Sequence, residues 1–230
     1  MKYDILLWDV DDTLLDFGYS ERYAIKQCFE SIGREINDEW ILRYSAINDS
    51  YWKRLEKGEV TKAEVLRGRF ADLFAEMNFE VEEEKLKEFQ LRYQRELGNV
   101  YHYRDSSYEL CNKLKGCCRQ YLVTNGVEST QRSKLKLSGL DALMNDVFIS
   151  EVIGFVKPRK EFFDACFAQI PDFSKERVLL IGDSLSSDIK GAVNAGVASC
   201  WYNPKGKTAD AIMPDYVIGN LWEVEKIITG

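Results

Sequence analysis

Two carboxylates, one residue apart, follow a short apolar run near the start of the chain. Asp9 and Asp11 come directly after Ile5–Trp8, and Asp12 and Thr13 follow them. Placing two carboxylates at the end of a buried strand costs free energy unless a cation or a reaction requires them. A single Asp-x-Asp is also common in acidic turns. The pair therefore indicates a reactive or cation-binding site only if other polar residues converge on it.

Polar residues follow three further apolar runs in the same way. Thr124-Asn125-Gly126 ends the second run, Lys157 lies beyond the third, and Gly182–Asp188 ends the fourth. If the runs form parallel strands, their carboxyl ends meet at one edge of the sheet, where such sheets bind ligands. A hydroxyl, a lysine and a glycine that lets backbone N–H groups approach all suit an anion such as phosphate. The four strand ends together predict one cleft that holds acids, a hydroxyl and a lysine.

The histidine content excludes several classes of enzyme. His102 is the only histidine in the chain. Ser-His-Asp triads and histidine phosphatases each need a histidine, and most zinc hydrolases need several. His102 lies in a polar and aromatic segment that we interpret as a surface loop. Any chemistry must therefore use carboxylates, lysine, hydroxyls and a metal ion.

Composition limits the partners and the location of the chain. Its 230 residues are 45% hydrophobic, which is ample for a buried core, and its net charge is −7. That charge opposes binding to nucleic-acid polymers and anionic membranes, although a metal ion and one lysine can still attract a small anion. The chain has six cysteines without a Cys-x-x-Cys pair, no secretory signal and no long apolar run. We therefore expect a cytoplasmic protein with core thiols and a small-molecule partner.

Short apolar runs alternate with helical patterns along most of the chain. The runs expected to form strands are Ile5–Trp8, Tyr121–Val123, Val147–Ile149, Val178–Ile181, Ala198–Tyr202 and Tyr216–Ile218. The patterns expected to form helices are Ser106–Leu114, Ser129–Leu137, Lys160–Ile170, Asp188–Ala195 and Leu221–Ile228. Such alternation is typical of a parallel sheet covered on both faces. We predict an α/β fold with a Rossmann-like, doubly wound parallel sheet.

Residues 19–98 interrupt this alternation and contain no convincing strand. Aromatic and aliphatic residues recur there with a helical period of about 3.6 residues, as in Tyr44, Ile47 and Tyr51. The stretch predicts about four amphipathic helices whose stripes form the core of a small bundle. We therefore predict a catalytic core of residues 1–18 and 99–230, interrupted by a helical bundle of residues 19–98.

These motifs resemble those of the haloacid dehalogenase superfamily, and the resemblance covers almost the whole chain. Asp9–Thr13 is similar to the first family motif, Thr124 to the second and Lys157 to the third. Asp183 and Asp188 are similar to the acidic fourth motif. The inserted bundle resembles the helical cap found after the first strand in one branch of the superfamily.

The resemblance narrows to the house-cleaning pyrimidine 5′-nucleotidases. The stretches that carry it are Ile47-Asn48, Tyr51-Trp52, Leu55–Gly58, Arg69-Phe70, Thr124–Val127, Gln131, Ser150–Gly154, Gly182–Leu185, Asp188-Ile189 and Cys200–Pro204. The chain departs from this subgroup at Ala192, where a second glycine usually follows Gly191, and at Ser133-Lys134. We expect both departures to lie away from the acids, so they affect the expected substrate range more than the expected chemistry.

The resemblance implies a Mg²⁺-dependent phosphomonoester hydrolase that forms an aspartyl-phosphate. Asp9 would be the nucleophile and Asp11 the general acid and base, with a pKa raised by burial. Asp9, the backbone carbonyl of Asp11 and the side chain of Asp183 are the expected Mg²⁺ ligands. Asp12 is expected to have a structural role in the turn.

The resemblance also implies roles for residues around these ligands. Thr124, the N–H groups near Asn125 and Gly126, and Lys157 are expected to bind the phosphoryl oxygens. Asp188 and Ser184 are expected behind the metal ligands, with Asp188 holding Lys157 or a water.

Several alternatives remain open at this point. A phosphatase of sugar phosphates or other small metabolites would use the same core, and so would a phosphomutase. A dehalogenase is disfavoured because displacing halide needs no general acid, whereas Asp11 is present. A catalytically silent binding protein is disfavoured because all the acids and Lys157 are present. We expect a small phosphorylated metabolite as partner, preferably a nucleoside monophosphate, and a monomer or small homo-oligomer.

Substrate choice must come from outside these core motifs, since they recognise only a phosphoryl group. Leu15–Tyr19, which leads out of the first strand, and Glu56–Thr61, a break between helices, are the expected specificity segments. The side chains that could contact a pyrimidine ring are Phe17, Tyr19, Asn48, Trp52 and Lys57. Trp52 could equally belong to the core of the bundle, because its spacing is helical.

Overall fold

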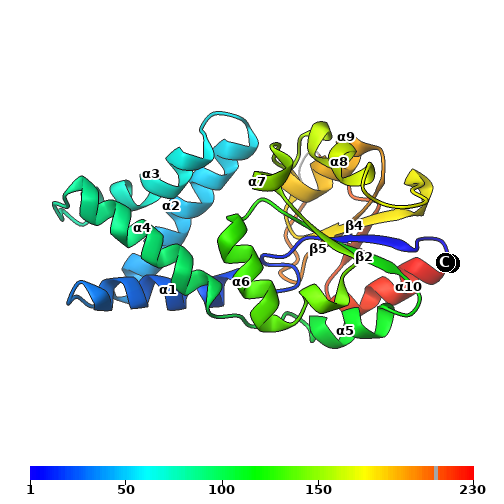
Figure 1. Cartoon of the computed structure of the whole chain (residues 1–230), viewed down its shortest axis with the longest axis horizontal. Helices are drawn as coiled ribbons and strands as arrows, with labels where there is room; N and C mark the ends of the chain where they lie inside the picture. The colour runs from blue at the N-terminus through cyan, green and yellow to red at the C-terminus, as the bar shows by residue number, and fades with distance from the viewer. Residues whose placement is uncertain (210–211) are drawn as a thin grey trace. The chain divides into compact units, whose positions relative to one another are not determined.

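The computed structural model describes residues 1–209 and 212–230, and these contain a six-stranded parallel sheet in the order β3-β2-β1-β4-β5-β6. The strands are β1 (Ile5–Trp8), β2 (Arg119–Thr124), β3 (Asp146–Ile149), β4 (Val178–Gly182), β5 (Ala198–Tyr202) and β6 (Tyr216–Ile218). Helices cover both faces of the sheet (Figure 1). The predicted α/β fold with a doubly wound parallel sheet is confirmed.

The central strand β1 explains why the apolar runs are nearly continuous. Successive side chains of a strand point to opposite faces, so Leu6 and Trp8 join one hydrophobic cluster and Ile5 and Leu7 join the other. All four residues are fully buried. A strand in this position is therefore apolar at every residue, because helices cover each face.

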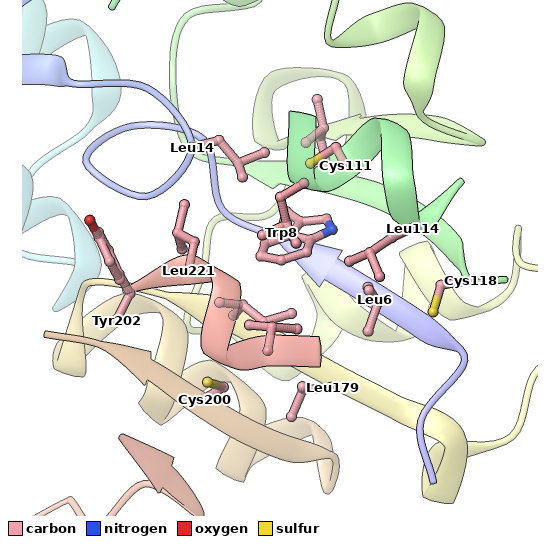
Figure 2. Close-up of a cluster of buried hydrophobic side chains, with 14 of the residues drawn as sticks. Leu6, Trp8, Leu14, Cys111, Leu114, Cys118, Leu179, Cys200, Tyr202 and Leu221 are labelled. Atoms are coloured by element: carbon pink, nitrogen blue, oxygen red, sulfur yellow. The ribbon is translucent and has the colours of Figure 1, made fainter. Parts of the chain in front are cut away.

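One face of the sheet packs against α5 and α10. Figure 2 shows Leu6 and Trp8 pointing from β1 toward Leu114 of α5. The indole Nε1 of Trp8 donates to the side-chain oxygen of Gln120 at 3.1 Å, and the Gln120 amide donates to the carbonyl of Cys111 at 2.8 Å. A buried glutamine is tolerated here because both ends of its amide have partners.

The opposite face packs against α8 and α9, which lie on the other side of the sheet from α5 and α10 (Figure 1). The helices of this unit are α5 (Ser107–Leu114), α6 (Glu128–Ser138), α7 (Ser150–Ile153), α8 (Lys160–Phe167), α9 (Lys190–Ala195) and α10 (Val224–Thr229). Short helical turns are η1 (Asp141–Leu143), η2 (Lys175–Arg177), η3 (Leu185–Ile189) and η4 (Leu221–Glu223).

Three predicted helices differ from the observed ones by more than one residue at an end. The pattern Lys160–Ile170 is α-helical only to Phe167. The pattern Asp188–Ala195 begins earlier, as the wide π-helical turn η3, and becomes α-helical at Lys190. The pattern Leu221–Ile228 begins as the tight 3₁₀ turn η4. Apolar periodicity identifies a buried helix face but not the local hydrogen-bond pattern at its ends.

The chain divides into two compact units, one of Met1–Phe17 with Tyr101–Gly230 and one of Gly18–Val100. The predicted boundaries, after residue 18 and before residue 99, lie within two residues of these. The division of roles between a catalytic core and a cap remains a prediction.

The second unit is helical and has an aromatic core. Its helices are α1 (Phe17–Ser31), which begins in the first unit, α2 (Asp38–Glu56), α3 (Lys62–Glu76) and α4 (Glu83–Gly98). Tyr44 stacks on Phe70 with ring centroids 5.3 Å apart, and Tyr93 packs edge-on against Phe70 at 5.1 Å. Thr61 and Glu64 form a reciprocal capping box that fixes the start of α3. The aromatic stripes of this unit are therefore core residues.

The cysteines are free thiols, and most of them are buried. The six cysteines are unpaired, and all are buried except Cys117, which is exposed. Among residues 1–209 and 212–230, no helix has the length and hydropathy needed to cross a membrane.

We expect Leu179→Ala to destabilise the protein by about 2–5 kcal/mol, because it opens a cavity in a packed core. Leu179 is fully buried on β4, within the cluster of Figure 2. Leu137→Ala on α6, where the side chain is 52% exposed, is the control and should change stability by less than about 0.5 kcal/mol. Denaturant unfolding measures both variants, and equal effects would contradict the assigned core.

Candidate active site

The acids identified in the sequence lie where the strand order reverses. From β1 the chain proceeds outward through β2 and β3, and then from β4 outward through β5 and β6, so β1 and β4 are neighbours. Asp9 follows β1 and Asp183 follows β4, and the Asp9 N–H donates to the carbonyl of Ile181 at 2.9 Å. Parallel sheets bind ligands beyond the carboxyl ends of their strands at this kind of reversal.

Asp9 is held at both carboxylate oxygens. Its Oδ1 accepts from Nζ of Lys157 at 2.6 Å, and its Oδ2 accepts from the hydroxyl of Thr13 at 3.0 Å. Burial raises the pKa of Asp9 to about 7, with Lys157 lowering this pKa and the charges of Asp188 and Asp11 raising it. An additional cation beside Asp9 would favour the ionised form that a nucleophile or metal ligand requires.

Lys157 connects three strand ends. Its side chain is 2% exposed. Its ammonium donates to Asp9, to Asp188 at 2.7 Å and to the carbonyl of Val123 at 2.9 Å, which uses all three of its donors. Burial acts to lower the pKa of Lys157, but Asp188 and Asp9 raise this pKa above its ordinary value. The Asn125 side chain exchanges two hydrogen bonds with the Lys157 backbone, at 2.9 and 3.0 Å. The lysine is therefore a fixed, fully paired cation.

The turn after β4 folds Asp188 back under the strand. The Ser184 N–H donates to Asp188 Oδ2 at 3.1 Å, and the Ser184 hydroxyl accepts from the Ser187 N–H at 3.2 Å. A Cβ on Gly182 would lie 2.3 Å from the Asp188 carboxyl carbon, so only glycine permits this approach. The expected contact between Asp188 and Lys157 is present, and Ser184 supports it from behind.

Asp9, Asp183 and Asp188 form the candidate metal centre. Carboxylate oxygens of the three residues lie within 4.8 Å of one another. Burial raises the pKa of Asp183 well above its ordinary value, and the charges of Asp9 and Asp188 raise this pKa further. Three carboxylates against the single ammonium of Lys157 leave excess negative charge, and oxygen-only ligands suit a hard divalent cation such as Mg²⁺. The donor set therefore fits the expected metal.

The predicted phosphate-binding residues reach the same edge, but their polar groups have internal partners. Thr124 ends β2 and is buried, and its hydroxyl oxygen accepts from the Gly126 N–H at 3.0 Å. The Asn125 amide holds the backbone of Lys157. Asn125 thus positions Lys157, a role that its sequence position did not indicate.

Two side chains of helix α6 bind the carboxylate of Asp11. Gln131 Nε2 donates to Oδ2 of Asp11 at 2.5 Å, and the Lys134 ammonium forms an ion pair with Oδ1. Gln131 was predicted only as a residue shared with the subgroup, and Lys134 as a departure that lies away from the acids. The ion pair with Asp11 shows that this expectation is wrong for Lys134. Their spacing could have indicated a shared role, because residues three apart lie on the same face of a helix.

Thr13 and Trp201 were also not predicted as site residues. Besides donating to Asp9, the Thr13 hydroxyl accepts from the Asp183 N–H at 3.1 Å and so ties the ends of β1 and β4 together. Trp201, on β5, donates from its indole to the carbonyl of Asp183 at 2.8 Å. The position of Thr13, four residues after Asp9 and within the acidic motif, was the available signal.

Asp12 supports the loop that leaves β1. Its backbone has a positive φ of 63°, and its Oδ1 accepts from the Phe17 N–H at 3.2 Å and from the Arg104 guanidinium at 2.6 Å. These contacts agree with the expected structural role. His102 is an exposed loop residue, as predicted.

Within the helical unit, Asn48 is buried and its amide is occupied. Its Nδ2 donates to Glu21 at 2.9 Å, and its Oδ1 accepts from Trp52 at 3.1 Å and from Arg69 at 2.8 Å. Asn48 therefore belongs to a buried polar network, and Trp52 is half-buried at its edge. Of the other candidates for substrate contact, Phe17 is half-buried, and Tyr19 and Lys57 are exposed.

We expect Mg²⁺ to raise the melting temperature, because a ligand that binds only the folded state stabilises it. Asp183→Asn removes one carboxylate of the metal centre and should abolish most of this rise. Glu161→Gln, an exposed change on α8, is the control and should leave the rise intact. Thermal melting with and without Mg²⁺ tests this, and an unchanged response in Asp183→Asn would exclude the assigned centre.

Comparison with known proteins identifies the family. The model for haloacid dehalogenase-like hydrolases matches residues 3–196. HAD-hydrolase YfnB of Bacillus subtilis is 39% identical over 99% of this chain and 96% of that protein. The magnesium-bound crystal structure of YfnB matches this chain with a TM-score of 0.94 and 38% identity, over the full length of both chains. Pyrimidine 5′-nucleotidase PynA of Streptococcus pneumoniae is 37% identical over 89% of this chain and 85% of that protein. Pyrimidine 5′-nucleotidase YjjG of Escherichia coli is 29% identical over 99% of each chain. As its motifs predicted, the chain belongs to the haloacid dehalogenase-like hydrolase family.

Proposed function

We propose that the chain is a Mg²⁺-dependent phosphomonoesterase that acts on pyrimidine nucleoside 5′-monophosphates through an aspartyl-phosphate. The observation that carries the chemistry is the grouping of Asp9 with Asp183, Asp188 and Lys157 at the reversal of strand order, with Asp11 two residues further on. Similarity to the two pyrimidine 5′-nucleotidases, over at least 85% of each chain compared, supports the substrate class.

In the first half of the reaction, the Asp9 carboxylate attacks phosphorus opposite the leaving oxygen. A bond forms between phosphorus and an Asp9 oxygen while the bond to the leaving oxygen breaks. Asp11, protonated at this stage, gives its proton to the departing alkoxide and becomes a carboxylate. The products are the aspartyl-phosphate and a free alcohol, which would be the nucleoside.

In the second half, Asp11 acts as the base. It takes a proton from a water molecule that attacks phosphorus, and the bond between phosphorus and Asp9 breaks. Phosphate leaves and the Asp9 carboxylate is restored. Asp11 is protonated again, so the residue is ready for the next leaving group.

Charge neutralisation makes attack by a carboxylate on an anionic ester feasible. Asp9, Asp183 and the backbone carbonyl of Asp11 would hold Mg²⁺, with Asp188 beside them, and the ion would offset negative charge during the attack. Lys157 supplies a second, fixed positive charge 2.6 Å from Asp9. Because Asp188, Val123 and Asn125 already orient this lysine, little reorganisation is needed during the reaction.

We expect Asp9→Asn to lower phosphatase turnover by several orders of magnitude, because an amide cannot form the aspartyl-phosphate. The variant keeps the size of the side chain, so folding should persist. Phosphate release measures the effect, and EDTA should abolish the activity of the unmodified protein. Substantial activity in Asp9→Asn, or activity that survives exhaustive chelation, would contradict the proposed mechanism.

We expect pyrimidine nucleoside monophosphates to have a higher kcat/KM than purine nucleotides and sugar phosphates. The discrimination must come from contacts to the leaving group, because the phosphoryl group is common to all these substrates. A panel of such phosphates at fixed Mg²⁺ concentration measures it. Higher kcat/KM for sugar phosphates would retain the phosphatase assignment and exclude the nucleotidase one.

A further inference from the structure

Both oxygens of the Asp11 carboxylate are held by side chains from one face of α6. Gln131 Nε2 donates to Oδ2 at 2.5 Å, and the Lys134 ammonium pairs with Oδ1. Two hydrogen bonds to different oxygens fix the plane of a carboxylate as well as its position, which a single contact cannot do. This arrangement, here called the α6 clamp, consists of Gln131 and Lys134.

The α6 clamp places polar groups in a buried position, which a purely structural role would not require. The Lys134 side chain is fully buried, and burying an ammonium is unfavourable unless its partner compensates. Gln131 is 2% exposed, and among the described residues its Oε1 is buried without a hydrogen-bond partner. An unpaired buried oxygen is also unfavourable. The polar group that the two side chains share is the carboxylate of Asp11.

The local backbone is adapted to this contact. A Cβ on Gly126 would lie 2.1 Å from Gln131 Nε2, so the glycine after β2 provides the space through which Gln131 reaches Asp11. Lys134 lies three residues further along α6, with its ammonium 5.9 Å from the centre of the Phe17 ring. The ammonium is therefore bordered by the acid and by an aromatic ring, which limits its alternative positions.

We propose that Gln131 and Lys134 are positioning residues that aim the Asp11 carboxyl group at the leaving-group oxygen and at the attacking water. The proposal rests on the proposed function, in which Asp11 transfers the proton. Proton transfer requires the carboxyl oxygen within hydrogen-bond distance of its target. Without the α6 clamp, the Asp11 side chain can rotate away from the reacting atoms, while Asp9, Lys157 and the metal centre keep their contacts.

The test compares poor and good leaving groups in single variants. Gln131→Leu and Lys134→Met each release one oxygen of Asp11, and Lys136→Met, on the exposed side of α6, is the matched control. For the most active alkyl phosphate of the panel, we expect kcat to fall about tenfold to a hundredfold in both clamp variants, since misplacing a catalytic group by about 1 Å has effects of this size. For an activated aryl phosphate, whose leaving group needs no proton, kcat should fall much less. Lys136→Met should change neither rate.

A double-mutant cycle shows whether the clamp acts through Asp11. In an Asp11→Asn background, adding Gln131→Leu or Lys134→Met should lower the alkyl phosphate rate by less than about threefold, because the group that they position is already lost. Thermal melting of each variant separates lost folding from lost positioning. If Lys134→Met does not fold, Gln131→Leu tests the same clamp through the other oxygen without changing a charge.

Three outcomes would overturn the proposal. Equal loss of kcat on alkyl and aryl phosphates would indicate a structural effect. A higher KM at unchanged kcat would make the α6 clamp a substrate-binding feature, and additive losses with Asp11→Asn would show that it acts elsewhere. The proposed function fails separately: in that case Asp9→Asn or Asp11→Asn itself would retain alkyl phosphate turnover, whatever the clamp variants do.

Discussion

The structure depends on one buried cation, the ammonium of Lys157, between the carboxylates of Asp9 and Asp188. Carboxylates this close repel one another in a poorly solvated site, and an unpaired buried charge is strongly unfavourable. The ends of two strands provide its surroundings. The carbonyl of Val123 in β2 accepts a hydrogen bond from the ammonium, and Gly182 at the end of β4 leaves room for Asp188 beside it. The site is therefore part of the packing of the sheet edge.

A second buried lysine, Lys134, pairs with the carboxylate of Asp11. Two lysines thus face the four carboxylates of Asp9, Asp11, Asp183 and Asp188. When all four acids are ionised, the remaining negative charge equals the charge of one divalent cation. A single Mg²⁺ would balance the cluster, in which burial and the neighbouring carboxylates raise the pKa values of Asp9 and Asp183.

The sequence predicts the fold and the acids of the site because both follow from one-dimensional patterns. Buried runs such as Ile5–Trp8 identify the strands, and parallel topology brings their ends together whatever the detailed packing. The roles of Asn125 and Lys134 depend on how a loop or helix approaches a strand end, which no periodicity specifies. Asn48 illustrates the same limit, since a helical pattern does not distinguish an amide that faces a ligand from one inside a bundle.

The two acid–lysine pairs differ in how far stability and chemistry can be separated. Lys157 and Asp188 are both almost fully buried, so removing Lys157 leaves the buried carboxylate of Asp188 without its counter-charge, at a cost of about 3–5 kcal/mol in such pairs. The Asp11 side chain is 25% exposed, so water can solvate its carboxylate when Lys134 is replaced. Replacing Lys157 is therefore expected to destabilise this edge of the sheet. The α6 clamp can vary with less damage to the fold, and one of its two residues, Lys134, is a position where the chain departs from the subgroup it resembles.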